Sequence, residues 1–445
     1  ATTIAHLYEI LKRIDGHQKE FIQAVEEVIE ALKPIFDKAP KYIGVFDRLM
    51  EPERVFMFRV PWIADKGAFQ VKRGFRVEFN CAIGPYKGVL RFHPSVKLGV
   101  LKFLGIEQIL KNSRTTLPMG GGKGGSDFDP QGKSDLEVKR FTQSFMTELY
   151  RHIGPYCDVP AGDSGVGARE IGFMFGQYKR LVNRFEGVRT GKGRNWGGSL
   201  IRPEASGYGS VYYDHEMLKW AGKDMKGLRA IVSGSGNVDQ YTCEKLLDLG
   251  AIPLTISDST GYVNEPEGFT RDGLAFVMEL QNVKRGRIPE YTKFSKTAKY
   301  FAGERAWNAA KADRAFPSAT QKEINKENAE ELVANGVFRV CEGANMPSTN
   351  EAIEINHANK FLYAPAKAAN AGGVAVSGLE LSQNSMRLYW TREEVDAKLL
   401  GIMQNFFKNC AETDEEFGAK GKFQLGANIA CFKKVADSKL DQGCC

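Results

Sequence analysis

The chain has 445 residues, which is too long for a single hydrophobic core and predicts two or three domains. Hydrophobic residues make up 42% and charged residues 26%, as in folded soluble proteins, and no apolar run is long enough for a membrane span or a secretion signal. The 61 basic residues are spread among 54 acidic ones, for a net charge of +7 without a basic block. This distribution disfavours a nucleic-acid partner and favours small anionic ligands.

The eight cysteines are scattered and form no C-x-x-C pair, which favours a reducing, cytoplasmic location. The six histidines show no H-E-x-x-H or similar spacing. We therefore expect no metal site.

The first part of the chain mixes helical and strand patterns. Residues 18–38 carry apolar side chains on one helical face, whereas "GFRVEFN", residues 74–80, alternates apolar and polar positions as a half-buried strand does. Residues 134–153 predict another helix, with a capping box that begins at Ser134. Residues 1–200 are therefore expected to form an α+β domain with a partly antiparallel sheet.

A glycine-rich stretch, "PMGGGKGGSDFDP" at residues 118–130, surrounds Lys123 with five glycines. An isolated run of this kind is typical of a loop, and its glycines would let the backbone approach a ligand without Cβ atoms in the way. A phosphate-binding loop is excluded, because that pattern needs Gly at 117 and Ser or Thr at 124, where the chain has Leu117 and Gly124.

From about residue 226 the pattern changes to strand, glycine turn, helix and strand. Gly234 and Gly236 form a Gly-x-Gly turn between a predicted strand and a predicted helix that begins at Asn237 and Val238, and a second predicted strand ends at Asp258. This order is that of the first βαβ unit of a dinucleotide-binding fold, in which the helix N-terminus receives the pyrophosphate.

Two further short apolar strands, in "FRVCEGAN" and "FLYAPAKAANAGG", end in small or amide residues, as strands beside a nucleotide do. We therefore expect an α/β protein with two domains and a cleft between them. An N-terminal α+β substrate and assembly domain with a mixed sheet, residues 1–200 joined by the C-terminal residues 420–445, precedes a Rossmann-like domain at residues 201–419.

The chain resembles the hexameric glutamate dehydrogenases in their short microbial form, which prefer NADP. The resemblance covers essentially the whole chain. It is carried by "GPYKGVLRFHPSV", "KFLGIEQILKNSRTTLPMGGGKGGSDFDP", "MTELYRHIGP", "VPAGDSGVGAREIG", "RPEASGYG", "SGSGNV", "EGANMPST", "NAGGVAVSGLE" and "GANIA".

The resemblance implies reversible oxidative deamination of L-glutamate to 2-oxoglutarate and ammonia by a cytoplasmic homohexamer that serves nitrogen assimilation. It implies that Lys123 is the catalytic lysine and that Asp163 shuttles the amine proton. Cationic neighbours and desolvation would lower the pKa of Lys123 toward neutrality. The substrate-binding residues that the motifs imply are Lys87 and Ser377 at the side-chain carboxylate, Gln108 and Lys111 at the α-carboxylate, and the backbone of Gly162.

The implied cofactor is NADP, with NAD as the alternative. An acidic residue at the position of Asp258 usually binds a ribose 2′-OH and suggests NAD, but the local sequence "SDS" looks like the family's NADP-preferring pattern. Ser259 and the basic residues Lys284 and Arg287 of "KRGR" are expected to bind the 2′-phosphate. The resemblance also implies contacts on the nicotinamide side by Ser206, where the family usually has threonine, and by Asn237, and a further contact with the cofactor by Asn345.

Two alternatives remain at this stage. One is a related dehydrogenase for leucine, valine or phenylalanine, which Lys87 disfavours because its charge would face an aliphatic side chain. The other is a catalytically impaired homologue that serves assembly or sensing. Asp239 is an unusual residue here, since it stands at the third fingerprint position, where Gly or Ala is normal, and we expect it to compete with the pyrophosphate. Other departures from the family pattern are Val89, Arg114, Ser164, Arg189, Arg229, Ser318 and Lys322.

Overall fold

The computed structural model describes residues 3–443, which divide into two compact units that are described separately. The first unit comprises the described chain up to Leu200, the segment Val376–Val395 and the chain from Asn428 onward. The second comprises Ile201–Ala375 and Asp396–Ala427.

These units differ from the domains expected from the sequence in two segments. Val376–Val395 belongs to the first unit, and residues 420–427 belong to the second. The first difference has a clear physical cause, because Glu380 accepts a hydrogen bond from the backbone N–H of Gly191 and forms a 2.9 Å ion pair with Lys192. These contacts join two segments that lie far apart in the sequence.

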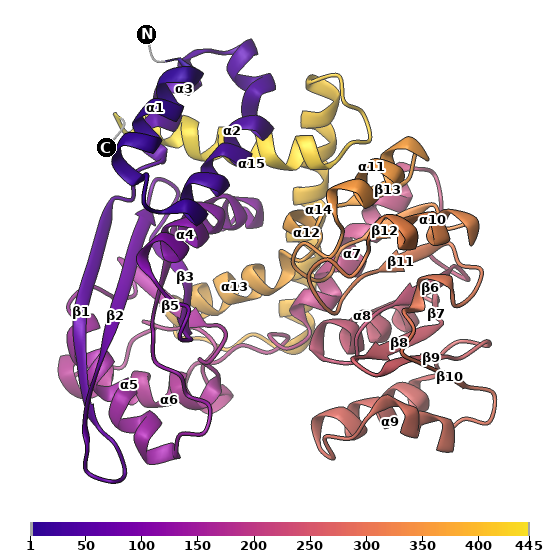
Figure 1. The fold of residues 1–445 in the computed structure, drawn as a ribbon, viewed down its shortest axis with the longest axis horizontal. Coiled ribbons are helices and arrows are strands. Elements are labelled where there is room, and N and C mark those ends of the chain that lie inside the picture. The colour runs from indigo at the N-terminus through magenta and orange to yellow at the C-terminus, as the bar shows by residue number, and fades with distance from the viewer. Residues whose placement is uncertain (1–2, 444–445) are drawn as a thin grey trace. The chain divides into compact units, whose positions relative to one another are not determined.

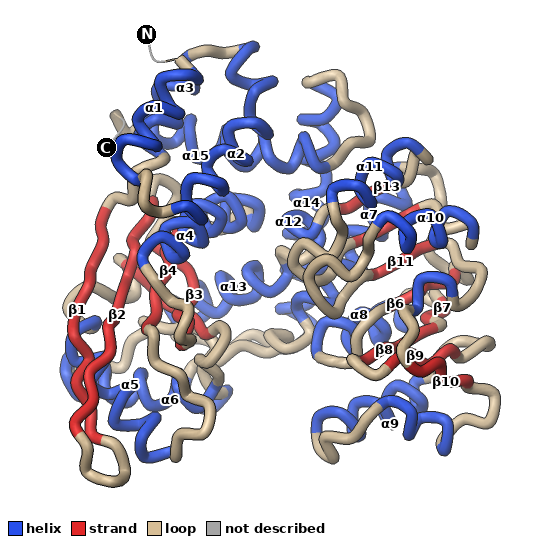
Figure 2. Tube along the Cα trace, viewed as in Figure 1, coloured by secondary structure: helices blue, strands red, loops and turns tan. Residues whose placement is uncertain are grey.

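A five-stranded mixed sheet forms the centre of the first unit (Figures 1 and 2). Its strands, in spatial order, are β1 (Arg54–Ile63), β2 (Phe69–Asn80), β4 (Gly121–Ser126), β3 (Tyr86–Phe92) and β5 (Asp158–Gly162). The first three pair antiparallel, whereas β3 pairs parallel to both β4 and β5. The expected mixed sheet and the strand over residues 74–80 are both confirmed.

The helices of the first unit follow the apolar patterns of the sequence. The predicted helix at residues 18–38 is α2, whose apolar stripe is buried, and the predicted capping box is present at Ser134, the N-cap of α5. These helices are α1 (Ile4–Asp15), α2 (Lys19–Lys38), α3 (Lys41–Leu49), α4 (Leu98–Asn112), α5 (Asp135–Leu149) and α6 (Ala168–Val182), with 3₁₀ turns η1 (Ser113–Thr115) and η2 (Arg194–Trp196).

Three long C-terminal helices contain the points at which the chain passes from one unit to the other. They are α13 (Gly372–Met386), α14 (Arg392–Glu416) and α15 (Gln424–Asp441).

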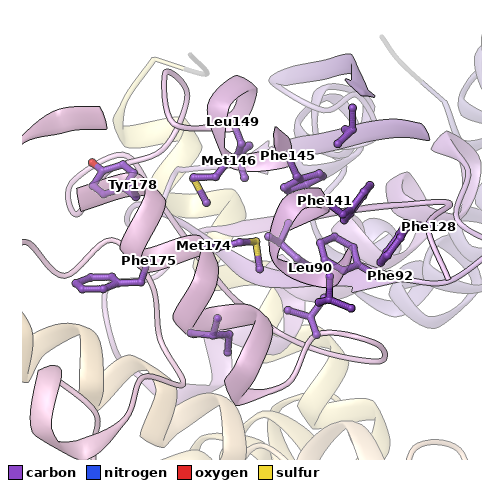
Figure 3. Packing of buried hydrophobic residues seen from close by; sticks show 14 of the residues in the cluster. Leu90, Phe92, Phe128, Phe141, Phe145, Met146, Leu149, Met174, Phe175 and Tyr178 are labelled. Atoms are coloured by element: carbon purple, nitrogen blue, oxygen red, sulfur yellow. The ribbon is translucent and has the colours of Figure 1, made fainter. Parts of the chain in front are cut away.

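Aromatic side chains fill the core between the sheet and helices α5 and α6 (Figure 3). Phe128 and Phe141 stack with ring centroids 3.8 Å apart, and Phe92 meets Phe141 edge-on. Each fully buried phenylalanine contributes about 1.5–3 kcal/mol from the apolar surface that it removes from water. This packing fixes β3, which carries one candidate site residue, against α5.

The second unit is built on a parallel sheet with the order β13-β12-β11-β6-β7. Neighbouring strands in this order are all parallel, and the chain reverses its direction of progress across the sheet at β6, so the Rossmann-like fold is confirmed. The strands are β6 (Arg229–Val232), β7 (Ile252–Pro253), β11 (Arg314–Phe316), β12 (Arg339–Cys341) and β13 (Leu362–Ala364).

A small antiparallel sheet and several helices complete the second unit. The sheet consists of β8 (Thr255–Asp258), β9 (Gly261–Asn264) and β10 (Lys299–Ala302). The helices are α7 (Ala205–Trp220), α8 (Asn237–Asp248), α9 (Arg271–Asn282), α10 (Lys326–Ala334), α11 (Asn350–Ala358) and α12 (Ala366–Ala369), with 3₁₀ turns η3 (Ile288–Lys293) and η4 (Ala306–Asn308).

A buried ion pair links β2 to β5 in the first unit. Arg76 donates two hydrogen bonds to Asp158, from Nε at 2.7 Å and from Nη2 at 2.5 Å, and both side chains are fully buried. The negative charge of Asp158 also favours the charged form of Arg189, whose guanidinium is buried as well.

We expect Asp158→Asn to destabilise the first unit by about 3–5 kcal/mol, because it leaves two buried arginines without their counter-ion. Chemical unfolding followed by tryptophan fluorescence measures the loss. The control is Asp135→Asn, which removes an exposed partner of Arg169 and should change stability by no more than about 1 kcal/mol. Equal effects of the two substitutions would contradict this assignment.

Candidate active site

Lys123 lies on β4, in the middle of the sheet, and is almost completely buried. Burial lowers its pKa to about 8; the negative charge of Asp163 opposes this shift, and the positive charge of Arg91 adds to it. The expected lowering of the pKa of Lys123 is thus present in the structure, and a neutral amine is accessible near physiological pH.

Asp163 follows the last residue of β5 and faces Lys123. Its Oδ2 atom lies 3.8 Å from Lys123 Nζ and accepts hydrogen bonds from Arg91 Nε at 3.2 Å and Nη2 at 3.1 Å. Arg91 was not among the predicted site residues, although it stands in the motif "GVLRFHP". These two hydrogen bonds converge on one carboxylate oxygen and hold the carboxylate beside the lysine.

The glycines around Lys123 form a strand and not a loop, which corrects the expectation from the sequence. A Cβ on Gly121 would lie 2.6 Å from Ile109 of α4, and a Cβ on Gly124 would lie 2.6 Å from the carbonyl of Phe75. The missing side chains therefore make room for neighbouring protein segments, and these glycines let α4 and β2 pack closely on β4.

Lys111 and Gln108 are on one face of α4, as their spacing predicts. Burial lowers the pKa of Lys111 to about 8, and the positive charges of Arg114 and Lys123 lower it further. Lys111 therefore lies close enough to Lys123 for their charges to interact.

Gln108 is positioned by Asn112, a buried residue that the sequence analysis did not single out. Gln108 Nε2 donates to Asn112 Oδ1 at 2.7 Å, and Asn112 Nδ2 donates to the carbonyls of Lys87 and Gly120. One amide thus ties α4 to the first residues of β3 and to the segment before β4.

Lys87 and Ser377 are brought together by Thr190, a second residue that the sequence analysis missed. Lys87 Nζ donates to Thr190 Oγ1 at 2.7 Å and to the carbonyl of Val159 at 3.0 Å. Thr190 Oγ1 is in turn 2.7 Å from Ser377 Oγ on α13. The three polar side chains form one buried cluster, as a site for the carboxylate of a substrate side chain requires.

In the second unit, a pocket of about 720 Å³ lies over the glycine turn and the N-terminus of α8. The predicted cofactor residues that line it are Gly234, Gly236, Asn237, Val238, Asp258 and Ser259. Gly234 has φ +98°, a conformation that glycine adopts easily, and its N–H donates to Ser257 Oγ at 2.7 Å. The turn is therefore tied to β8, at the place where this fold binds the phosphates of a dinucleotide.

Asp258 uses both carboxylate oxygens within the protein. One accepts from the backbone N–H and the hydroxyl of Thr260, and the other accepts from the backbone N–H of Ile288. Arg287, the residue before Ile288, donates to Ser259 Oγ at 3.2 Å. Ser259 lines the pocket, and Arg287, which does not line it, is joined to Ser259 by this hydrogen bond.

The other predicted cofactor residues do not line this pocket. Lys284 forms a 3.0 Å ion pair with Glu279, and Asn345 accepts a hydrogen bond from Asn370. Ser206 lies on α7, where its Oγ is 2.7 Å from the position of a Cβ on Gly373. For Lys284 the ion pair follows from its position just after α9, next to an acidic residue of that helix.

Within residues 3–443, no helix is long and apolar enough to cross a bilayer. The same residues contain no group of three or more His, Cys, Asp and Glu side chains that could hold a metal ion.

A Rossmann-like unit with a glycine turn, together with a lysine of lowered pKa beside a fixed carboxylate, defines the class of nicotinamide-dependent amino-acid dehydrogenases. The sequence model described as "Glutamate/Leucine/Phenylalanine/Valine dehydrogenase" matches residues 197–443, and the model "Glu/Leu/Phe/Val dehydrogenase, dimerisation domain" matches residues 52–180. The chain belongs to the Glu/Leu/Phe/Val dehydrogenase family.

Individual relatives are similar over almost their full lengths. The NADP-specific glutamate dehydrogenase of Giardia intestinalis is 58% identical, over 100% of this chain and 99% of its own. The NAD(P)-specific glutamate dehydrogenase of Xylanibacter ruminicola is 56% identical, over 98% of each chain. The solved structure of Plasmodium falciparum glutamate dehydrogenase 2 is 55% identical, with a TM-score of 0.98 over 99% of this chain and 97% of its own.

Asp163→Asn is expected to lower turnover at least about 100-fold with little change in substrate affinity, because the amide keeps the shape of the carboxylate but cannot accept a proton. Steady-state absorbance of the reduced cofactor gives kcat and KM. Asp127→Asn is the control. Asp127 follows β4, forms an ion pair with Arg73 and does not contact Lys123. More than about a tenth of the wild-type turnover would contradict the role of Asp163.

Proposed function

We propose that this chain is an NADP-dependent glutamate dehydrogenase. It converts L-glutamate, NADP⁺ and water reversibly into 2-oxoglutarate, ammonium, NADPH and a proton. The observation that carries this proposal is the Lys123–Asp163 pair, 3.8 Å apart, with two further lysines, Lys87 and Lys111, in the same unit. The Lys123–Asp163 pair would transfer protons, and Lys87 and Lys111 would each bind one of the two carboxylates of the substrate.

The proposed substrate sites are at two separate clusters of the first unit. Lys111, together with the amide of Gln108, would bind the α-carboxylate near Lys123. Lys87, Thr190 and Ser377 would bind the side-chain carboxylate through charge and two hydroxyl groups. In this arrangement the reacting α-carbon would lie between Lys111 and Lys123, near the proposed proton-transfer groups.

Proton transfer is assigned to Asp163 and Lys123. Asp163 accepts the proton of the substrate ammonium, so that the amine can form an imine, and Arg91 keeps the carboxylate in place. Lys123, with a pKa of about 8, assists the water that attacks the imine carbon. NADP, when bound, accepts the hydride from the α-carbon.

The cofactor preference rests on Asp258, Ser259 and Arg287. Asp258 is engaged by Thr260 and by the backbone of Ile288, so it is less available to a ribose hydroxyl than an acid in an open turn. Ser259 and Arg287 supply a hydroxyl and a cation for a 2′-phosphate. These contacts support NADP over NAD.

We also propose that the chain works as a cytoplasmic homohexamer that serves nitrogen assimilation. The outer face of β1 and β2 supports assembly, because Phe69 is 84% exposed, Met57 67% and Val71 60%. This face lies within residues 52–180, the segment that the family model describes as a dimerisation domain.

Lys87→Leu is expected to raise KM for glutamate and to reduce discrimination against apolar amino acids by at least about tenfold. The reason is that it removes the positive charge proposed to bind the side-chain carboxylate. The measurement is kcat/KM for glutamate and for norvaline. Lys139→Leu, on the exposed face of α5, is the matched control. Unchanged discrimination would place the specificity site elsewhere.

The wild-type chain is expected to show a higher kcat/KM with NADP than with NAD, and Arg287→Ala should reduce this preference about tenfold by removing a charged hydrogen bond. Arg271→Ala provides the control, because Arg271 is exposed and pairs with Asp248. A wild-type preference for NAD, or an unchanged ratio in Arg287→Ala, would contradict the proposed phosphate site.

A further inference from the structure

Asp239 lies in the first turn of α8, with its carboxylate directed at the glycine turn. A Cβ on Gly234 would lie only 2.8 Å from Asp239 Oδ1, and a Cβ on Gly236 would lie 3.8 Å from the same atom. Asp239 also lines the 720 Å³ pocket. The carboxylate therefore occupies the region in which a dinucleotide phosphate meets the helix N-terminus.

The carboxylate is buried and only partly hydrogen-bonded. Asp239 is 2% exposed, and its Oδ2 atom has no hydrogen-bond partner among the described residues. The backbone N–H groups of Asp239 itself and of Gly236 hydrogen-bond to the carboxylate and favour its charged form. These are N–H groups of the turn that binds the pyrophosphate in this fold.

The charges around Asp239 do not compensate for its own. The charged residues that line the same pocket are Asp258, Glu304, Arg305 and Glu323. Burial raises the pKa of Asp239 well above the ordinary value of 3.8, and the negative charge of Glu323 adds to this shift. Arg305 stabilises the charged form of Glu323. Burial raises the pKa of the Cys243 thiol, one turn further along α8, and the negative charge of Asp239 adds to this shift.

We propose that cofactor binding to this chain is coupled to the uptake of one proton by Asp239. In the charged form, the carboxylate holds the backbone N–H groups of the turn and repels the pyrophosphate. In the neutral form, the repulsion is absent and the N–H groups are released to the phosphate oxygens. The proton comes from solvent, so the coupling makes affinity depend on pH.

The sign of the pH dependence follows from this scheme, which rests on the proposed use of NADP. Below the pKa of Asp239 the carboxyl is already neutral and the coupling contributes nothing. Above it, each unit of pH weakens binding by up to about tenfold, since a proton must be taken up first. A chain with Gly or Ala at this position, the usual residues of the fingerprint, would lack the effect because it has no carboxyl to neutralise.

The experiment is calorimetric titration of NADP⁺ into the wild-type protein and Asp239→Asn, at several pH values and in two buffers of different ionisation enthalpy. Asparagine keeps the shape of the neutral acid and has no proton to gain. The wild type is expected to take up as much as one proton per site more than Asp239→Asn, and to show the steeper loss of affinity as the pH rises. The 2′-phosphate of the ligand also titrates, but equally with both proteins.

Asp272→Asn is the control, because Asp272 is an exposed acid in the first turn of α9 and should keep the wild-type proton uptake. Equal proton uptake by the wild type and Asp239→Asn at every pH, with the same pH dependence of affinity, would overturn the inference. If neither protein bound NADP⁺, the proposed function itself would fail together with the inference.

A second measurement requires no cofactor. Because the pKa of Asp239 is raised in the folded protein, ionisation of the unfolded chain destabilises the wild type as the pH rises above about 3.8. The melting temperature of Asp239→Asn relative to the wild type should therefore rise with pH from about 3.8 up to the raised pKa of the folded protein and stay level above it. A difference that stays constant across the whole acidic range would contradict the burial of this acid in its neutral form.

Discussion

The candidate active site depends on one constraint, namely that β4 approaches its neighbours more closely than any strand with side chains can. A Cβ on Gly88 of β3 would lie 1.7 Å from the carbonyl oxygen of Gly122, and a Cβ on Gly125 would lie 1.9 Å from the carbonyl oxygen of Arg91. Lys123 is the one long side chain on this strand. It consequently emerges from a packed and rigid surface, where burial rather than any single partner lowers its pKa.

Charged pairs of the first unit, one of them buried and one partly exposed, fix the remaining geometry. Asp163 is shared by Arg91 and Lys123, and Lys192 with Glu380 attaches α13 to the segment that carries Thr190. A buried pair such as Lys192–Glu380 contributes little net stability, because desolvation opposes the Coulomb attraction, but it permits few alternative arrangements, whereas Arg91 and Asp163 are partly exposed. These pairs position the hydroxyl and amine groups of the proposed substrate site.

Residues that depart from the family pattern fall into different environments. Arg114 donates from Nε to Cys431 Sγ, and Arg229 donates to the carbonyl of Pro266. The guanidinium of Arg189 is buried without a hydrogen-bond partner among the described residues, and nothing in the structure explains this residue. Asp239 is the departure with a direct consequence for ligand binding, because it is buried against the turn that binds phosphate.

Local patterns in the sequence determined the elements and the class of each unit. The apolar stripe of α2, the capping box of α5 and the strand, glycine turn and helix at Gly234 all form as predicted, because short-range sterics and periodic burial decide them. The motifs also identified Lys123 and Asp163, which the structure brings within 3.8 Å.

Only the tertiary structure decided which residues complete each cluster. Arg91 contacts Asp163, Asn112 contacts the carbonyl of Lys87, and Thr190 contacts Ser377, which is 187 residues away, and no local spacing encodes these contacts. The glycines around Lys123 became a central strand for the same reason, since strand pairing depends on which segments pack beside it. Sequence determined the local backbone preferences and the available chemistry, whereas burial and long-range packing determined pKa values and partners.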